Sequence, residues 1–205
     1  MVHEFLNKND VEAYRKNALK HINVVFELEN NHNICFFDML SYGTIKVATK
    51  EMLEMKLSKI GPDFLDLSTT QEIFLERIKK KTNLNKMIGN ILMNQKIISG
   101  IGNYLRADSL WLAQISPHRL VKDLSDVELN TIFKSIRALV WSDYDQKKAI
   151  KLKFIKKSFK TPQHYGRDFF IYYYTEDIYG NKIKKEELYE GSQKRFIYWV
   201  PGIQK

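Results

Sequence analysis

A glycine turn that leads into a helix most constrains the local fold of this chain. Residues 100–102 read Gly-Ile-Gly, and Asn103 follows where an N-cap belongs, ahead of Leu105, Leu110 and Trp111. Glycines permit a tight turn and a close approach of a ligand to the backbone. The free N–H groups and positive dipole end of such a helix predict a phosphate site. The alternative for so short a pattern is an ordinary corner between two helices.

Charge and cysteine usage limit the class of protein. The 205 residues carry 33 Lys+Arg against 24 Asp+Glu, a net charge of +9, which favours a polyanionic partner without singling one out. The single cysteine, Cys35, excludes an intrachain disulfide framework and a multi-cysteine zinc site. No apolar run approaches the roughly 20 residues that cross a bilayer, and the start resembles no signal peptide. We therefore expect an intracellular protein that has no membrane partner.

The first part of the chain predicts a small antiparallel sheet. Residues 21–28 are rich in β-branched and aromatic side chains, and shorter runs of the same kind occupy 34–37 and 44–47. Turn-forming residues separate these runs. Three short strands are too few to close a sandwich on their own.

The middle of the chain, from about 50 to 142, has helical periodicity. Ser68 with Gln71 and Ser125 with Glu128 have the spacing of capping boxes, which mark helix starts. A strong apolar stripe follows the second box, and we expect it to face the core of a helix bundle. Its members are Leu129, Ile132, Phe133, Ile136, Leu139 and Val140.

The rear of the chain is first basic and then aromatic. Residues 146–167 contain seven lysines and no acidic residue, a pattern that also fits a solvated helix face. From 168 to 200 aromatic side chains are crowded, and Tyr179-Gly180-Asn181-Lys182 predicts a turn between two short strands. We therefore expect a β-hairpin in this region.

The segment from 95 to 119 as a whole resembles the helix–two-turns–helix signature of the Fpg/Nei family of DNA glycosylases. Gln95, Gly100-Ile101-Gly102-Asn103 and Pro117 stand at the family's positions. The run Asn103-Tyr104-Leu105-Arg106 is more similar to the endonuclease VIII (Nei) branch than to the Fpg branch. The resemblance implies that Asn103 and Gly102 hold a phosphate that flanks the damaged nucleotide.

The resemblance extends toward the N-terminus. Residues 38–43, Asp-Met-Leu-Ser-Tyr-Gly, stand where the family carries an intercalation loop, but the two arginines of the Fpg loop are absent. Leu40 or Tyr42 then becomes the candidate that fills the void left by a flipped base, with sheet core as the alternative. Lys81 and Lys86 are candidate phosphate contacts.

The resemblance also extends toward the C-terminus. Residues 165–167 match the entry to the family's zinc finger, but the four cysteine positions fall near Glu176, Tyr179, Val200 and Ile203. The resemblance therefore implies a zincless finger, without metal or cofactor, stabilised by aromatic packing. Arg195 matches the arginine that grips the phosphate beside the damaged nucleotide and assists the second elimination. Its alternative is a surface arginine on a hairpin.

The implied fold class is α+β, in three parts. Residues 1–66 would be the remnant of an N-terminal β-sandwich, 67–161 the helix–two-turns–helix domain, and 162–205 a zincless-finger β-hairpin.

The family's nucleophile has no counterpart at the start of this sequence. Family members attack C1′ of the damaged nucleoside with an N-terminal proline, assisted by the adjacent glutamate, whereas this chain begins Met-Val-His-Glu. The resemblance puts Met1 near the family's void-filling methionine. Either the recorded start is too late or the gene encodes a shortened protein. We favour the first, because the open edges of half a sandwich would promote aggregation.

The resemblance implies a base-excision-repair enzyme that is both DNA glycosylase and AP lyase. Its partner would be double-stranded DNA with an oxidised base, pyrimidines foremost, or an abasic site, and we expect a monomer. The alternative is a shortened, non-catalytic protein that binds damaged DNA. A third interpretation is a basic helical scaffold that binds RNA or protein.

Overall fold

The computed structural model describes residues 21–29, 32–38, 40–144, 169–190 and 193–205, and the chain divides into two compact units. The first unit is Met1–Lys50 and the second is Glu51–Lys205. No helix in the described ranges is long and apolar enough to cross a membrane. The predicted lysine-rich stretch at 146–160, the match at 165–167 and Met1 lie outside the described residues.

A two-stranded antiparallel sheet forms the described part of the first unit. Strand β1 (Ile22–Glu27) pairs with β2 (Asn33–Phe37), with Val25 opposite Cys35. The prediction of a third strand at 44–47 is wrong, and Val47 is fully exposed. A strand needs a neighbour for its backbone groups, and β1 and β2 pair with each other. Helix α2 (Lys50–Leu57), at the boundary between the units, buries none of its residues.

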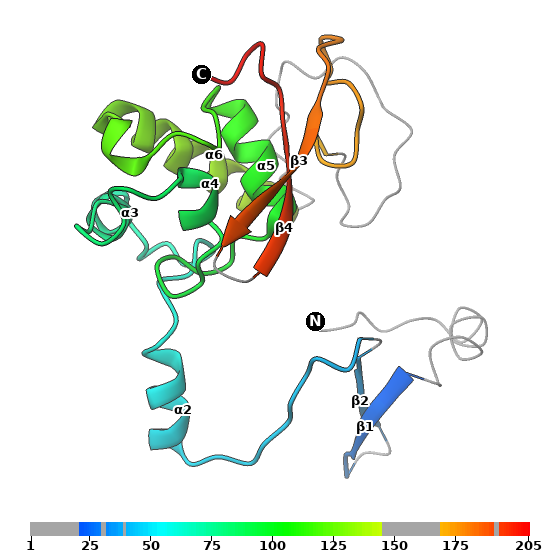
Figure 1. Ribbon diagram of the computed structural model, residues 1–205. Helices are drawn as coiled ribbons and strands as arrows, with labels where there is room; N and C mark the ends of the chain where they lie inside the picture. The colour runs from blue at the N-terminus through cyan, green and yellow to red at the C-terminus, as the bar shows by residue number, and fades with distance from the viewer. Residues whose placement is uncertain (1–20, 30–31, 39, 145–168, 191–192) are drawn as a thin grey trace. The chain divides into compact units, whose positions relative to one another are not determined.

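Helices are the main regular elements of the second unit (Figure 1). They are α3 (Gln71–Ile78), α4 (Ile88–Ile91), α5 (Asn103–Leu112), a 3-10 helix η2 (Val121–Asp123) and α6 (Asp126–Tyr144). Helix α6 packs against α3 and α5. The predicted apolar stripe on α6 faces the core, with four of its members, Leu129, Ile132, Ile136 and Leu139, fully buried.

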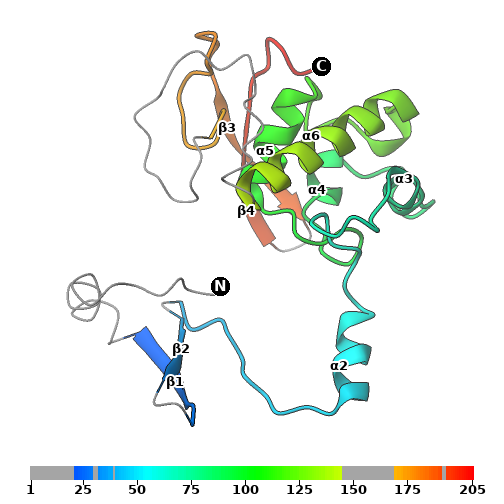
Figure 2. The ribbon, with the colours of Figure 1, turned by 180° about the vertical axis from the view of Figure 1, so that it is seen from behind.

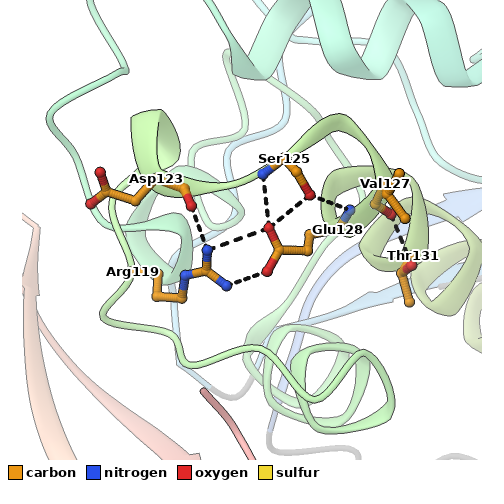
Figure 3. Close-up of polar contacts among 6 residues, drawn as sticks. All are labelled: Arg119, Asp123, Ser125, Val127, Glu128 and Thr131. Carbon is orange, nitrogen blue, oxygen red and sulfur yellow. Dashed lines mark hydrogen bonds and ion pairs between the residues drawn. The ribbon is translucent and has the colours of Figure 1, made fainter.

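One of the two predicted capping boxes is confirmed. Ser125 Oγ accepts from the Glu128 N–H, and the Ser125 N–H donates to Glu128 Oε2 at 2.8 Å (Figure 3). The box predicted at Ser68 is wrong, because Thr70 caps α3 by accepting from the Ile73 N–H. The Ser68 N–H is instead bonded to the carboxylate of Asp66 at 2.8 Å.

The confirmed capping box predicts an acid-sensitive contribution to stability. Hydrogen bonds from Arg119 and from the Ser125 backbone lower the pKa of Glu128 from 4.5 to about 2. A carboxylate whose pKa is lower in the folded state stabilises the protein above pH 4.5, and that contribution is lost as the pH falls toward 2. A third of the Glu128 side chain is exposed, so we expect Glu128→Gln to lower the free energy of unfolding by only about 1–2 kcal/mol at pH 7.

Urea unfolding at several pH values between 7 and 3 measures this effect. The difference between wild type and Glu128→Gln should narrow steadily toward pH 3. Glu76→Gln, at an exposed position on α3, is the control and should cost little at any pH. If the loss of unfolding free energy in Glu128→Gln stays constant with pH, the lowered pKa of Glu128 is not the source of its contribution to stability.

The C-terminal residues form the predicted β-hairpin. Strand β3 (Lys184–Glu190) pairs antiparallel with β4 (Gln193–Trp199), with Leu188 opposite Arg195. The turn at 179–182 was expected to join two strands, but it precedes β3 and is closed by a bridge between Glu176 and Lys182. Both views show β4 beside α5, and the two elements are in contact (Figures 1 and 2). The second unit is therefore a mixed helix and strand fold centred on α5.

Candidate nucleic-acid interface

The turn before α5 is shaped by the side chain of Gln95. Its Nε2 donates to the Ile101 carbonyl at 2.9 Å, and its Oε1 accepts from the Gly100 N–H at 3.0 Å. Gly100 has a φ of +84°, a conformation that L side chains rarely adopt. The backbone itself therefore requires the first glycine of the motif.

The second glycine of the motif, Gly102, is not required by its backbone conformation. Gly102 is the N-cap of α5 with an ordinary φ of −99°, and no heavy atom lies within 4 Å of the place a Cβ would take. Neither the backbone nor internal packing demands glycine at 102. The first N–H groups of α5 have no acceptor within the helix. The open space in front of them fits a bound anion.

These two glycines make a matched pair of variants. Gly100→Ala should destabilise the protein by about 1–2 kcal/mol, since the new Cβ takes a strained φ and lies 2.9 Å from Asp63 Oδ1. Gly102→Ala should cost at most about 1 kcal/mol, the usual loss for alanine at an N-cap, yet weaken DNA binding. Thermal unfolding and DNA titration of both variants measure the contrast. Unchanged DNA affinity in Gly102→Ala would contradict the prediction that a DNA phosphate occupies the open space beside Gly102.

Asn103 is the first residue of α5 and not its N-cap, so the predicted capping role is wrong. Its half-buried side chain accepts at Oδ1 from Arg106 and donates from Nδ2 to the Tyr172 hydroxyl at 3.3 Å. Burial, with a hydrogen bond to Tyr173, raises the pKa of Tyr172 to about 12, so this hydroxyl is protonated at neutral pH. Asn103 therefore lies at the junction of α5 with the aromatic segment that precedes the hairpin.

Helix α5 holds the C-terminal segment through buried polar contacts. Asp108, which is fully buried, accepts from the N–H groups of Phe170 and Ile171 at 3.2 and 3.1 Å. Trp111 stacks on Phe170 and donates from Nε1 to Asp177 at 3.2 Å. Through these contacts the aromatic segment and the turn at 177–181 are fixed to α5.

Two buried polar side chains organise the turns at which the family's metal ligands were expected. Asp177 accepts from the N–H groups of Tyr179 and Asn181, both at 2.9 Å. Gln204 accepts from the Val200 N–H at 2.6 Å and donates to the Ile115 carbonyl at 2.9 Å. Among the described residues no group of three or more His, Cys, Asp or Glu side chains could hold a metal. Each turn is thus hydrogen-bonded both within itself and to α5 or the residues just after it.

None of the four expected cysteine positions carries a cysteine or a histidine. Glu176 pairs with Lys182 at 2.5 Å, Tyr179 is exposed, Val200 is buried and Ile203 is half-buried.

The predicted DNA contacts lie at separate places. Arg195 is exposed on β4, next to Phe196, whose carbonyl accepts from Arg106 at 2.9 Å. Lys81 and Lys86 are exposed in the connection between α3 and α4. In the first unit Leu40 and Tyr42 are 69% and 85% exposed, so neither is part of a core formed by the described residues. The structure brings Asn103 and the strand of Arg195 together, and it describes Leu40 and Tyr42 within the first unit alone.

Sequence reasoning missed the buried polar residues of this interface. These are Arg106, Asp108, Asp177 and Gln204, each of which acts through a contact distant in sequence. The structure shows why two of these residues need such contacts. Residues 105–111 are all buried, and a helix that is buried all around must pair any charge that it carries.

Comparisons with known proteins agree with this geometry. Residues 60–155 match the model of the formamidopyrimidine-DNA glycosylase H2TH domain. Endonuclease 8 of Pectobacterium carotovorum is 31% identical over 174 residues, which are 82% of this chain and 61% of that protein. Formamidopyrimidine-DNA glycosylase of Rickettsia felis is 36% identical over 123 residues, which are 59% of this chain and 43% of that protein.

Solved structures of low sequence identity share the fold. A viral DNA glycosylase aligns with a TM-score of 0.66 at 20% identity over 91% of this chain and 69% of its own. Lactococcus lactis Fpg in complex with DNA containing an abasic site aligns with a TM-score of 0.66 at 23% identity, over 90% of this chain and 66% of its own. The chain spans about half the length of the curated relatives that it matches.

The fold around α5 is that of a helix–two-turns–helix (H2TH) domain. The chain is homologous to the Fpg/Nei family of DNA glycosylases, and the predicted resemblance is confirmed.

Proposed function

We propose that this protein binds double-stranded DNA at an oxidised base or an abasic site. The observation that carries the proposal is the open start of α5, where Gly102 leaves space in front of the first turn of the helix and Asn103 supplies a side-chain amide. A phosphate that flanks the lesion would accept from these groups. Arg195 on β4 would bind the phosphate beside the damaged nucleotide, and Lys81 and Lys86 would contact phosphates farther away.

The proposed activity is that of a DNA glycosylase with AP lyase activity. An amine attacks C1′ of the damaged nucleoside, the base leaves and a Schiff base forms between the amine and the sugar. Removal of a proton from the sugar then expels the 3′ phosphate, and a second elimination, assisted by Arg195, expels the 5′ phosphate. Oxidised pyrimidines are the proposed substrates, since the match to endonuclease 8 extends over more of the chain than the Fpg matches do.

The finer architecture belongs to the same proposal. Residues 1–66 would contribute a partial β-sandwich, 67–161 the helix–two-turns–helix domain and 162–205 a finger that needs no metal. The hydrogen bonds of Asp177 and Gln204 support a metal-free finger, since they organise the two turns that a metal would otherwise join. The exposure of Leu40 and Tyr42 supports a role in filling the void left by a flipped base.

The alternative function is the binding of damaged DNA without cleavage. It needs only the phosphate contacts proposed above at Gly102, Asn103 and Arg195.

Borohydride trapping on a duplex with an abasic site separates the two functions. Reduction of a Schiff base leaves a covalent protein–DNA adduct that denaturing electrophoresis detects. An adduct with the 205-residue chain would establish lyase chemistry in this chain and overturn the alternative. Binding of the lesion duplex without an adduct would establish the alternative for this chain. Absence of both binding and adduct would overturn the proposed function.

A further inference from the structure

Arg106 is the largest of the fully buried side chains in the part of the chain that the structure describes. It is 1% exposed and lies on α5, one turn after Asn103. Burying a charged guanidinium is costly unless hydrogen-bond acceptors replace the water that it loses. The groups around Arg106 must therefore supply acceptors that offset the cost of burying its charge.

Arg106 joins three separate elements. Nη1 donates to the carbonyl of Gly89 in α4 at 3.2 Å, and Nη2 donates to the carbonyl of Phe196 in β4 at 2.9 Å. Nη2 also donates to Oδ1 of Asn103. One nitrogen thus bridges the Asn103 side chain and the backbone of the residue next to Arg195.

This contact fixes the orientation of the Asn103 amide. A guanidinium has only donors, so the group of Asn103 that faces it must be the oxygen. The Nδ2 group of Asn103, at the start of α5, then points away from Arg106 and donates to the hydroxyl of Tyr172 in the aromatic segment. Without the arginine, the amide could turn over and present its oxygen, which would repel a phosphate.

We propose that Arg106 is a positioning residue that sets both phosphate contacts at once. It holds the Asn103 amide with its Nδ2 donor on the side away from the guanidinium, and it holds the backbone of β4 beside α5 so that Arg195 keeps its place relative to Asn103. This inference rests on the proposed DNA-binding function of Asn103 and Arg195. Lysine is a poor substitute, because its single ammonium lacks the planar fork that reaches acceptors on different elements.

A double-mutant cycle with Asn103 tests the proposal. We expect Arg106→Lys to weaken binding to a duplex that carries a tetrahydrofuran abasic analogue about tenfold. This is the change expected for the loss of one charge-assisted hydrogen bond. The plot of log affinity against log salt should become shallower by about 0.9, because Arg195 loses its contact with a phosphate when β4 is no longer held. Adding Arg106→Lys to Asn103→Ala should then cost much less than it does in wild type, because its main target is already gone.

Arg137→Lys is the matched control. Arg137 on α6 likewise makes three hydrogen bonds, but all three are to backbone carbonyls, those of Phe64, Asp66 and Thr69. Both lysine variants should lower the melting temperature, whereas only Arg106→Lys should change the salt slope. Losses from Arg106→Lys and Asn103→Ala that simply add, or an unchanged salt slope, would overturn the proposal. Arg106→Gln is the second variant if the lysine variant does not fold.

A readout without DNA separates this inference from the proposed function. The side-chain amide protons of Asn103, observed by NMR in the free protein, should exchange faster with solvent in Arg106→Lys and be unchanged in Arg137→Lys. Unchanged exchange in Arg106→Lys would overturn the positioning role even if DNA binding is intact. Failure of wild type to bind the lesion duplex would instead overturn the proposed function, and the positioning role with it.

Discussion

Replacing Asp177 with alanine is expected to lower the free energy of unfolding by about 3–4 kcal/mol, the cost of leaving several buried donors without an acceptor. The carboxylate of Asp177 accepts from the Tyr179 and Asn181 N–H groups, from the Asn181 side chain and from Trp111 Nε1. For a domain of this size the melting temperature should fall by about 6–16 °C. DNA affinity should fall as well, because the loosened turn precedes the strands that carry Arg195.

Glu176→Ala is the control for this loss. Glu176 is the adjacent acidic residue, and its partner Lys182 is largely exposed, so we expect a change within about 0.5 kcal/mol. Treatment of wild type with EDTA should leave the melting temperature unchanged, because the turns are organised by side-chain hydrogen bonds. Similar losses from both alanine variants, or a large fall in melting temperature with EDTA, would contradict this account of the hairpin.

Removing the two proposed phosphate contacts should produce the second large effect, on binding. Asn103→Ala and Arg195→Ala should each weaken binding to the lesion duplex by about 10–100-fold, the range for a lost hydrogen bond to a charged group. Arg195→Ala should also make the salt dependence shallower by about one phosphate contact, whereas Asn103→Ala should leave it nearly unchanged, because the amide carries no charge. Fluorescence anisotropy titration at several salt concentrations measures both quantities.

Lys134→Ala supplies the control for the charge change. Lys134 is exposed on α6, and its removal should alter affinity only slightly. If Asn103→Ala and Arg195→Ala bind as well as Lys134→Ala does, the roles taken from the family are wrong for this chain.

Local patterns in the sequence predicted much of the helical fold. The apolar stripe at 129–140 predicts a helix that buries one face, and the spacing of Ser125 and Glu128 predicts where it starts. The stripe and the capping spacing both depend on residues close in sequence, so they can be recognised without knowledge of distant contacts. The 95–119 segment also identified the family, because its glycine, asparagine and proline positions are unusual in combination.

Features that depend on distant partners could not be predicted in the same way. The run at 44–47 has the composition of a strand, yet β1 and β2 pair with each other and leave it outside the sheet. Thr70 rather than Ser68 caps α3, because the helix begins at Gln71 and Thr70 directly precedes it, while the Ser68 N–H is bonded to Asp66. Asn103 bonds to Tyr172, a residue 69 positions away, which no local pattern could indicate.

The roles of Asn103, Gly102 and Arg195 in DNA binding remain predictions of the family resemblance. The buried residues beneath them are what the structure adds. Arg106 holds the amide of Asn103, and Asp108, Asp177 and Gln204 hold the segments around the hairpin. The geometry of the candidate site is therefore determined by buried polar residues on α5 and in the segments packed against it.

One measurement tests the central claim most directly. The 205-residue protein is titrated with a duplex that carries a single tetrahydrofuran site and with the same duplex undamaged. We expect the lesion duplex to bind at least about tenfold more tightly, since a damaged nucleotide is cheaper to extrude from the stack. Asn103→Ala should remove most of that preference. Equal affinity of wild type for the two duplexes would contradict a site built to hold the phosphates of a damaged nucleotide.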